Sequence, residues 1–91
     1  MLIDADRLRA TLQRELEALD RTRDELSGRV ARAKAATRGE WVRLDGHLDR
    51  ARHEIMRLGT DCSQSIEAIE GTARRLMDEV RRGYVHMRHS L

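Results

Sequence analysis

Few residues of this chain have types and spacing that could carry chemistry. His86 and His89 stand three residues apart, so on a helix both rings lie on one face and can bind one metal ion. No cysteine lies near them, and the closest acids are Asp78 and Glu79. Such a pair is more typical of a solvated helix end than of a metal site.

A second candidate metal site lies near the middle of the chain. Asp45, Asp49 and His53 repeat every four residues, a spacing that places ligands on one helix face inside bundles. Bundle sites also take carboxylates from facing helices, and the earlier part of the chain offers glutamates without a matching Glu-x-x-His. The spacing alone therefore favours an ordinary helix face over a metal centre.

Catalytic motifs are absent from the sequence. The single cysteine, Cys62, falls within an apolar series, which predicts a buried and inert thiol rather than a nucleophile. The chain has no glycine-rich phosphate loop, no nucleophile elbow and no zinc motif. We expect no catalysis, no cofactor and no bound metal.

The C-terminal stretch is rich in arginine. From residue 74 to residue 91, five arginines and two histidines meet only two acids. The cluster could contact phosphates or anionic lipid headgroups, but basic residues also suit the negative end of a helix dipole. The possible anion contacts are Arg74, Arg75, Arg81, Arg82 and Arg88.

The composition predicts an all-α protein with a single helical domain over residues 1–91. Of the 91 residues, 40% are hydrophobic and only 2% aromatic, with no phenylalanine and no proline. An aromatic-centred core is therefore excluded, and no run of β-branched residues alternates with polar ones as strands require. The 18 basic residues, all but one arginine, exceed the 16 acids by a net charge of only +2.

The expected location is the cytoplasm. One cysteine cannot form a disulfide within the chain, and no stretch approaches the ~20 apolar residues of a membrane span. The first ten residues contain acids where a secretory signal carries a basic head and an apolar run. Secretion without a leader is left open.

The first predicted helix covers residues 4–36. Asp4 is its expected N-cap, Arg23 is the one gap in its apolar stripe, and glutamates pair with arginines four residues later at 17–21 and 25–29. Steps of three and four define the stripe as one face. It consists of Leu8, Leu12, Leu16, Leu19, Leu26, Val30 and Ala33.

The second predicted helix covers residues 38–90. Its apolar positions form one narrow series with an average step of about 3.6 residues, which suits a contact between two helices. The series is Trp41, Leu44, Leu48, Ala51, Ile55, Leu58, Cys62, Ile66, Ile69, Ala73, Leu76, Val80, Tyr84, Met87 and Leu91.

A turn is predicted near residues 34–40. Thr37 and Glu40 form a capping box, and Trp41 stands at the position of a hydrophobic staple, with Gly39 leaving space where the chain reverses. The alternative is an uninterrupted helix, because Ala33, Thr37 and Trp41 also keep a four-residue spacing.

These elements predict a long antiparallel helical hairpin that assembles into a four-helix bundle or coiled coil. The shorter first helix covers the second only to about residue 70, at 1.5 Å per residue. The apolar edge beyond that point then requires a partner. The alternative is a monomeric three-helix bundle with a break near Gly59, where Asp61 and Gln64 imitate a second capping box.

Two helices of this length, joined near residue 40 by a turn bearing Trp41, resemble the WXG-motif helical hairpins exported by type VII secretion systems. The tripeptide Trp41-Val42-Arg43 stands where that family has Trp-x-Gly, and Arg88 stands where it has an acid four residues after Tyr84. The resemblance covers nearly the whole chain and implies a hairpin that pairs with a second hairpin.

We expect a non-catalytic protein–protein interaction module, an adaptor, chaperone-like or structural subunit, whose partner is a second copy or another helical protein. The alternative is a binder of nucleic acid or of an anionic membrane surface through the C-terminal arginines. Acids interleave with arginines through residue 70, unlike the concentrated charge of most nucleic-acid binders. The predicted partner interface is Trp41, Leu44, Leu48, Ile55, Leu58, Ile66, Ile69, Leu76, Val80, Tyr84 and Met87.

Overall fold

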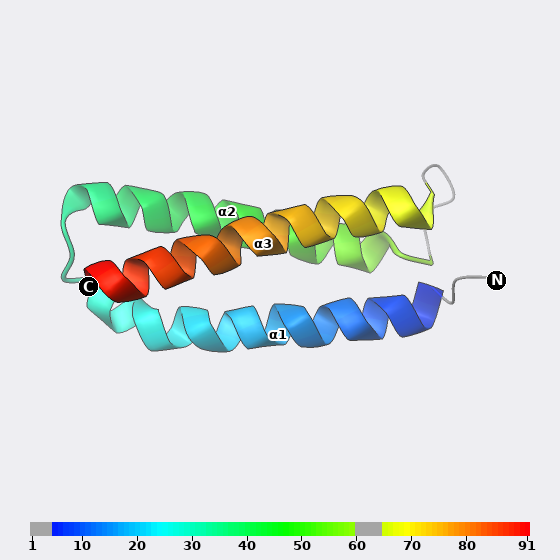
Figure 1. The fold of residues 1–91 in the computed structure, drawn as a ribbon, viewed down its shortest axis with the longest axis horizontal. Helices are drawn as coiled ribbons and strands as arrows, with labels where there is room; N and C mark the ends of the chain where they lie inside the picture. Colours follow the sequence, from blue (N-terminus) through cyan, green and yellow to red (C-terminus); the bar gives the residue numbers. More distant parts are fainter. Residues whose placement is uncertain (1–4, 60–64) are drawn as a thin grey trace.

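The computed structural model describes residues 5–59 and 65–91, which form three helices running up, down and up (Figure 1). The helices are α1 (Ala5–Val30), α2 (Ala35–Arg57) and α3 (Ile66–Ser90). They lie side by side in a rod about 47 Å long, and α3 ends beside the connection between α1 and α2. The prediction of an all-α chain is confirmed. Across the described residues, no helix is long and apolar enough to cross a membrane.

Five of the seven residues of the predicted stripe are buried in α1, but the helix ends earlier than residue 36. Its last turn tightens, because the Arg32 amide donates to Arg29 and the Ala33 amide donates to Val30, at 3.2 and 2.9 Å. Asp4 lies outside the described residues. The buried residues are Leu12, Leu16, Leu19, Leu26 and Val30.

The predicted capping box at Thr37 is wrong. The N-cap of α2 is Lys34, whose extended backbone precedes the helix and whose side chain makes no capping hydrogen bond. Thr37 already lies inside the helix, where the alanines at 35 and 36 are strong helix formers that start it earlier. Gly39 needs no special space either, since a Cβ there would meet nothing within 4 Å. Trp41 lies within α2 and not in the turn.

The continuous helix predicted over residues 38–90 is also wrong, because the chain breaks after Arg57. Leu58 is extended and Gly59 has a φ of 81°, in the left-handed region that glycine adopts without steric cost. A new helix then starts after Ser65, whose hydroxyl accepts a hydrogen bond from the Ala68 amide at 3.1 Å. The three-helix arrangement with a break near Gly59, predicted as the alternative, is the one found. Asp61, Cys62 and Gln64 lie outside the described residues.

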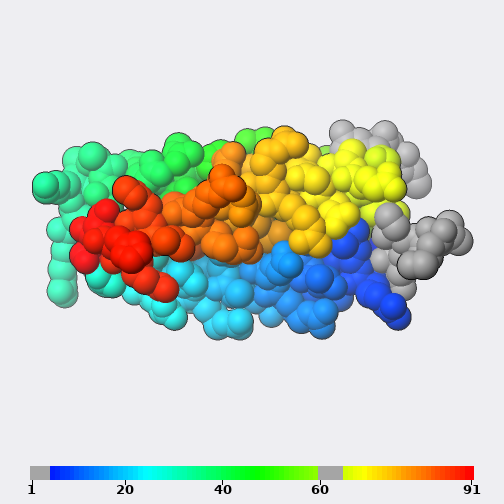
Figure 2. All heavy atoms as spheres, in the orientation of Figure 1, coloured from blue at the N-terminus to red at the C-terminus, as the bar shows by residue number. Residues whose placement is uncertain are grey.

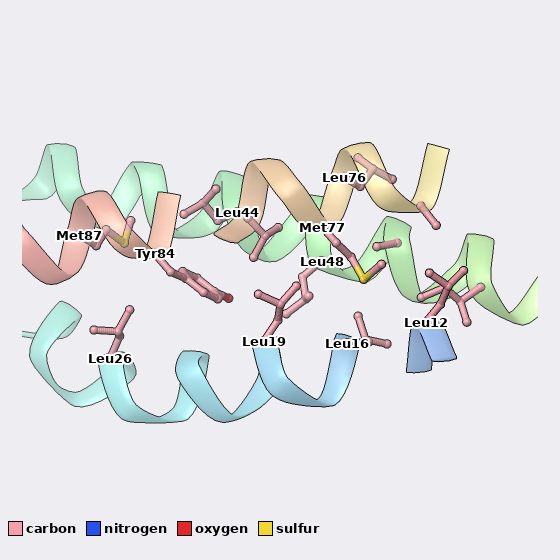
Figure 3. Packing of buried hydrophobic residues seen from close by; sticks show 14 of the residues in the cluster. Leu12, Leu16, Leu19, Leu26, Leu44, Leu48, Leu76, Met77, Tyr84 and Met87 are labelled. Carbon is pink, nitrogen blue, oxygen red and sulfur yellow. The ribbon is translucent and has the colours of Figure 1, made fainter. Parts of the chain in front are cut away.

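The break turns the apolar series into the core of a single chain. Because α3 folds back, its apolar face meets α1 and α2, and the edge beyond residue 70 is covered from within (Figure 3). All 17 buried side chains of the described residues are apolar or tyrosine, and none is charged. The contributions of α2 and α3 are Leu44, Leu48, Ala51, Ile55, Ile69, Ala73, Leu76, Met77, Val80, Tyr84 and Met87.

α2 and α3 approach each other closely at Gly83. A Cβ built on Gly83 would lie 2.5 Å from the Cδ1 of Leu44, so any larger residue there would require the buried Leu44 side chain to shift. Gly59, Gly71 and Gly83 recur every twelve residues in the sequence but share no structural role. Gly59 ends a helix, Gly83 admits Leu44, and a Cβ on Gly71 would meet nothing within 4 Å.

Candidate anion-binding groove

The residue that interrupts the stripe of α1 forms a polar centre with α2. Arg23 donates from Nε to Asp45 Oδ1 at 2.5 Å and from Nη2 to Asp45 Oδ2 at 3.0 Å. Its guanidinium also lies 5.8 Å from the centroid of the Trp41 ring, within cation–π range. The paired hydrogen bonds raise the pKa of Arg23, so the ion pair is permanent at any physiological pH. In the sequence, Arg23 appeared only as a gap in the apolar stripe of α1. Its place on that buried face was the signal that could have identified it as part of a site.

Tyr84 completes this centre from α3. Its ring lies 5.5 Å from the ring of Trp41, centroid to centroid, tilted by 34°. Its side chain lies among the buried apolar residues (Figure 3), and its buried hydroxyl finds no hydrogen-bond partner within the described residues. Burial raises the pKa of Tyr84 to about 12, so the hydroxyl stays protonated and neutral at physiological pH. The centre therefore joins three helices through packing and one ion pair, and offers no nucleophile.

The proposed ligands Asp45, Asp49 and His53 are engaged by cations of the protein or exposed, and they form no metal site. Arg52 reaches Asp20 at 3.0 Å and Asp49 at 3.7 Å, and His53 lies 3.7 Å from Asp49. In the ranges 5–59 and 65–91, no three His, Cys, Asp or Glu side chains gather around a common point. The acids and arginines between α1 and α2 therefore neutralise one another.

The histidine pair near the end of α3 is likewise separate from any acid cluster. His86 lines an open hollow of about 310 Å³ beside Glu40, while His89 is exposed. Glu40 accepts two hydrogen bonds from Arg43, which lower the pKa of Glu40 and hold its carboxylate. These residues do not form a cation site.

The predicted partner interface is inside the molecule. Of its eleven residues, nine are buried against other helices of the same chain, and Trp41 and Ile66 are partly buried. A partner cannot reach such a surface without unfolding the bundle. Sequence periodicity located the apolar faces, which here pack within the chain, and their use as a partner interface stays a prediction.

The arginines of α3 divide into those held by acids and those that are not. Arg82 lies 2.8 Å from Asp78 of its own helix, so its charge is paired within α3. Arg75 is exposed and has no acidic partner in the described part of the chain. The five arginines therefore do not form one continuous free basic surface.

Arg74, Arg81 and Arg88 are seven residues apart and so share one face of α3, toward α1. Arg74 reaches Glu15 of α1 at 3.4 Å and Arg88 reaches Glu25 of α1 at 3.1 Å. Arg81, between them, approaches only Asp78 of its own helix, at 3.5 Å. The central arginine of the row therefore lacks the acid from α1 that each neighbour has.

Arg81 stands where two adjoining hollows meet, and we call these together the α1–α3 groove. The first hollow, of about 390 Å³, is lined by Glu15, Arg74, Arg75, Asp78 and Arg81. The second, of about 160 Å³, is lined by Leu19, Thr22, Arg81, Tyr84, Val85 and Arg88. Figure 2 shows this face, with α3 in yellow to red above α1 in blue to cyan. The groove combines a cationic row with an apolar recess.

Comparison of the chain with protein-family models, with curated proteins and with solved structures finds no match in any of the three. Its function must therefore be inferred from the surface that the fold presents.

Proposed function

We propose that the chain is a non-catalytic protein-interaction module that binds an acidic helix of a partner protein along the α1–α3 groove. The observation that carries the proposal is the position of Arg81. Its two neighbours in the row are each paired with an acid from α1, whereas Arg81 faces Leu19 and Thr22 across the groove. A carboxylate from a partner would complete the row.

The dimensions and lining of the groove suit a short helix. The row from Arg74 to Arg88 spans fourteen residue steps of α3, about 21 Å at 1.5 Å per residue. Four guanidiniums line the groove against two carboxylates, and arginine matches carboxylates in a bidentate manner. Val85, with 52% of its surface exposed, forms an apolar step beside the smaller hollow. An acidic helix with one apolar anchor complements both features.

Such a helix would complete a four-helix bundle, the assembly predicted from the sequence, but by a different contact. The apolar series packs inside the chain, so the partner would bind along the α1–α3 groove instead. The other large exposed apolar residues of the described chain, Val42 and Met56, lie fourteen residues apart on α2. The resemblance to the WXG-motif hairpins stays a prediction about assembly, as do a second copy of the chain as partner and the cytoplasmic location.

The alternative of nucleic-acid binding through α3 has less support. Arg74, Arg82 and Arg88 are already held by acids, and a phosphate backbone would have to displace those carboxylates. Trp41 and Tyr84, which are all the aromatic residues of the chain, stack on each other and offer no platform for bases.

The test places a photo-crosslinking amino acid at Val85, with the same substitution at Val42 as the matched control on α2. Irradiation in native cells should cross-link a partner from position 85 through an acidic helical segment, and Arg81→Glu should abolish that product. Arg21→Glu makes the same charge change at an exposed arginine of α1 and should leave the product intact. Equal cross-linking from positions 42 and 85, or products insensitive to Arg81→Glu, would contradict the proposal.

A further inference from the structure

The end of the rod that holds the connection between α1 and α2 carries an excess of positive charge. Residues 26–39 contain four cations and no acid, leaving 14 basic against 16 acidic residues elsewhere in the chain. The net positive charge of the molecule is therefore located at this end. We call the four cations the basic cap; they are Arg29, Arg32, Lys34 and Arg38.

The cations of the basic cap are exposed, and three of them have no partner among the described residues. Arg29 donates to the main-chain oxygen of Leu91 at 2.8 Å. Arg32, Lys34 and Arg38 have no side-chain hydrogen bond or ion pair within the described residues. Arg38 follows Lys34 by four residues, one helical turn, so the two side chains lie on the same face. The cap is thus a compact group of exposed charges around one tight turn, and three of the four are free.

Arg29, in the last turn of α1, suits the dipole of that helix, but Lys34 and Arg38 lie at the start of α2, where a positive charge is unfavourable. Helix N-termini carry partial positive charge and are stabilised by acids, yet the first turn of α2 has no acid and its N-cap is Lys34. Lys34 and Arg38 therefore repel the helix dipole, and no nearby side chain compensates them. A charge arrangement that destabilises its own helix indicates an external anion.

We propose that the basic cap docks the end of the bundle onto an anionic lipid bilayer. The exposed residues between its cations are the small apolar residues Ala31, Ala35 and Ala36, which a membrane interface tolerates and which add nothing to contacts with a duplex backbone. The bundle measures about 20 by 16 Å in cross-section, so this end meets a flat surface with all four cations close to it. Without a large apolar anchor, the attachment is electrostatic and reversible.

The strength of this attachment follows from the number of charges. Each cation close to an anionic leaflet strengthens binding by roughly fivefold, so removing three of them should weaken partitioning by about a hundredfold. Raising the salt concentration should weaken it as well, because the charges are exposed and screening acts over about 10 Å at 0.1 M. The inference is independent of the α1–α3 groove, which lies along a different face.

The experiment is a sedimentation assay with vesicles of phosphatidylcholine, alone or with about one-third phosphatidylserine. The test variant is the triple substitution Arg32→Gln, Lys34→Gln and Arg38→Gln. The matched control carries Arg14→Gln, Arg21→Gln and Arg50→Gln, three exposed arginines away from the cap, and has the same net charge. Circular dichroism melting verifies that both variants fold.

The wild type and the control should sediment with the phosphatidylserine vesicles at low salt, and the test variant should remain in the supernatant. Absence of wild-type binding at low salt, or equal losses in the two variants, would overturn the proposal. A gel-shift assay with duplex DNA tests whether the basic cap binds nucleic acid instead. Binding to DNA that depends on the cap, without binding to vesicles, would reassign the cap to nucleic acid and overturn the membrane proposal.

Discussion

α3 contacts α2 and α1 in different ways. The difference separates the close packing that specifies the fold from the ion pairs that adjust it. Against α2, it packs so closely that one methyl group at Gly83 would collide with Leu44. Against α1, it leaves a groove bridged by ion pairs at Arg74 and Arg88. The first contact depends on shape and tolerates no added volume, whereas the second depends on exposed charge and can adjust.

α1 has the same polar character toward α2. Arg23 and Asp45, Arg52 and Asp20, and the Arg9 guanidinium on the Leu58 carbonyl all join the two helices around their apolar contact. Exposed ion pairs contribute little individually and weaken in salt, so α1 should be the helix most sensitive to ionic conditions. Shape specifies the pairing of α2 with α3, and charge specifies the orientation of α1.

The largest expected effect is at the close contact. Gly83→Leu should destabilise the protein by about 3 kcal/mol, because the added side chain must displace Leu44 from a filled core. Gly71→Leu is the matched control in the same helix, and it should stabilise by up to about 1 kcal/mol because leucine is the better helix former and the site is open. Urea unfolding of both variants measures the difference. Similar values at the two positions would contradict the close packing of α2 and α3.

The next effect is at the polar centre of α1. Arg23→Ala should cost about 2 kcal/mol, because it removes a bidentate ion pair and uncovers the Trp41 ring. A double-mutant cycle with Asp45→Asn isolates the coupling, and the more exposed pair of Arg52 and Asp20 serves as its control with a coupling below about 0.5 kcal/mol. Equal couplings would mean that the aromatic face adds nothing to the Arg23 pair.

Tyr84 gives a smaller effect that depends on pH. Its pKa is raised to about 12 in the folded chain, so between about pH 10 and pH 12 the unfolded chain loses this proton first and the stability falls. Tyr84→Phe should be nearly neutral at pH 7, since its hydroxyl has no partner in the described residues, and should recover about 1 kcal/mol at pH 11. Thermal melts across this range check the sign. A large loss at pH 7 would reveal a hydrogen bond to the hydroxyl.

The smallest expected effect on stability compares the first residues of α2 and α3. Ser65→Ala removes the hydrogen bond to the Ala68 amide and should cost about 1 kcal/mol. Thr37→Ala should change stability by less than about 0.5 kcal/mol, because Thr37 lies inside α2 and caps nothing. If Thr37→Ala were as costly as Ser65→Ala, α2 would start near residue 37, as the sequence pattern suggested.

The sequence predicted the helix type and the apolar faces but not their arrangement. Periodicity identifies which side of a helix is buried but not what covers that side, so Leu76 and Val80 were as compatible with an external partner as with the other helices of the chain. Gly59 could not be distinguished from Gly71 or Gly83, because only the folded backbone reveals a positive φ or a close contact.

The candidate groove could be predicted only in part from the sequence, for a similar reason. The arginines of the C-terminal stretch were identified, but pairing with Glu15 and Glu25 joins residues about sixty positions apart. The isolation of Arg81 appears only when α1 is laid beside α3. The threonine capping box was misleading because the same four-residue pattern also occurs within helices.

The fit of Leu44 against Gly83 also bears on the order in which the helices assemble. This contact joins neighbouring helices through tight packing, whereas the contacts between α1 and α3 join residues about sixty positions apart and include exposed ion pairs that form only when both helices are in place. We expect α2 and α3 to form the folding nucleus and α1 to dock afterwards. Mutations at Leu44 should slow folding, and mutations at Glu15 or Glu25 should mainly speed unfolding, which stopped-flow kinetics would separate.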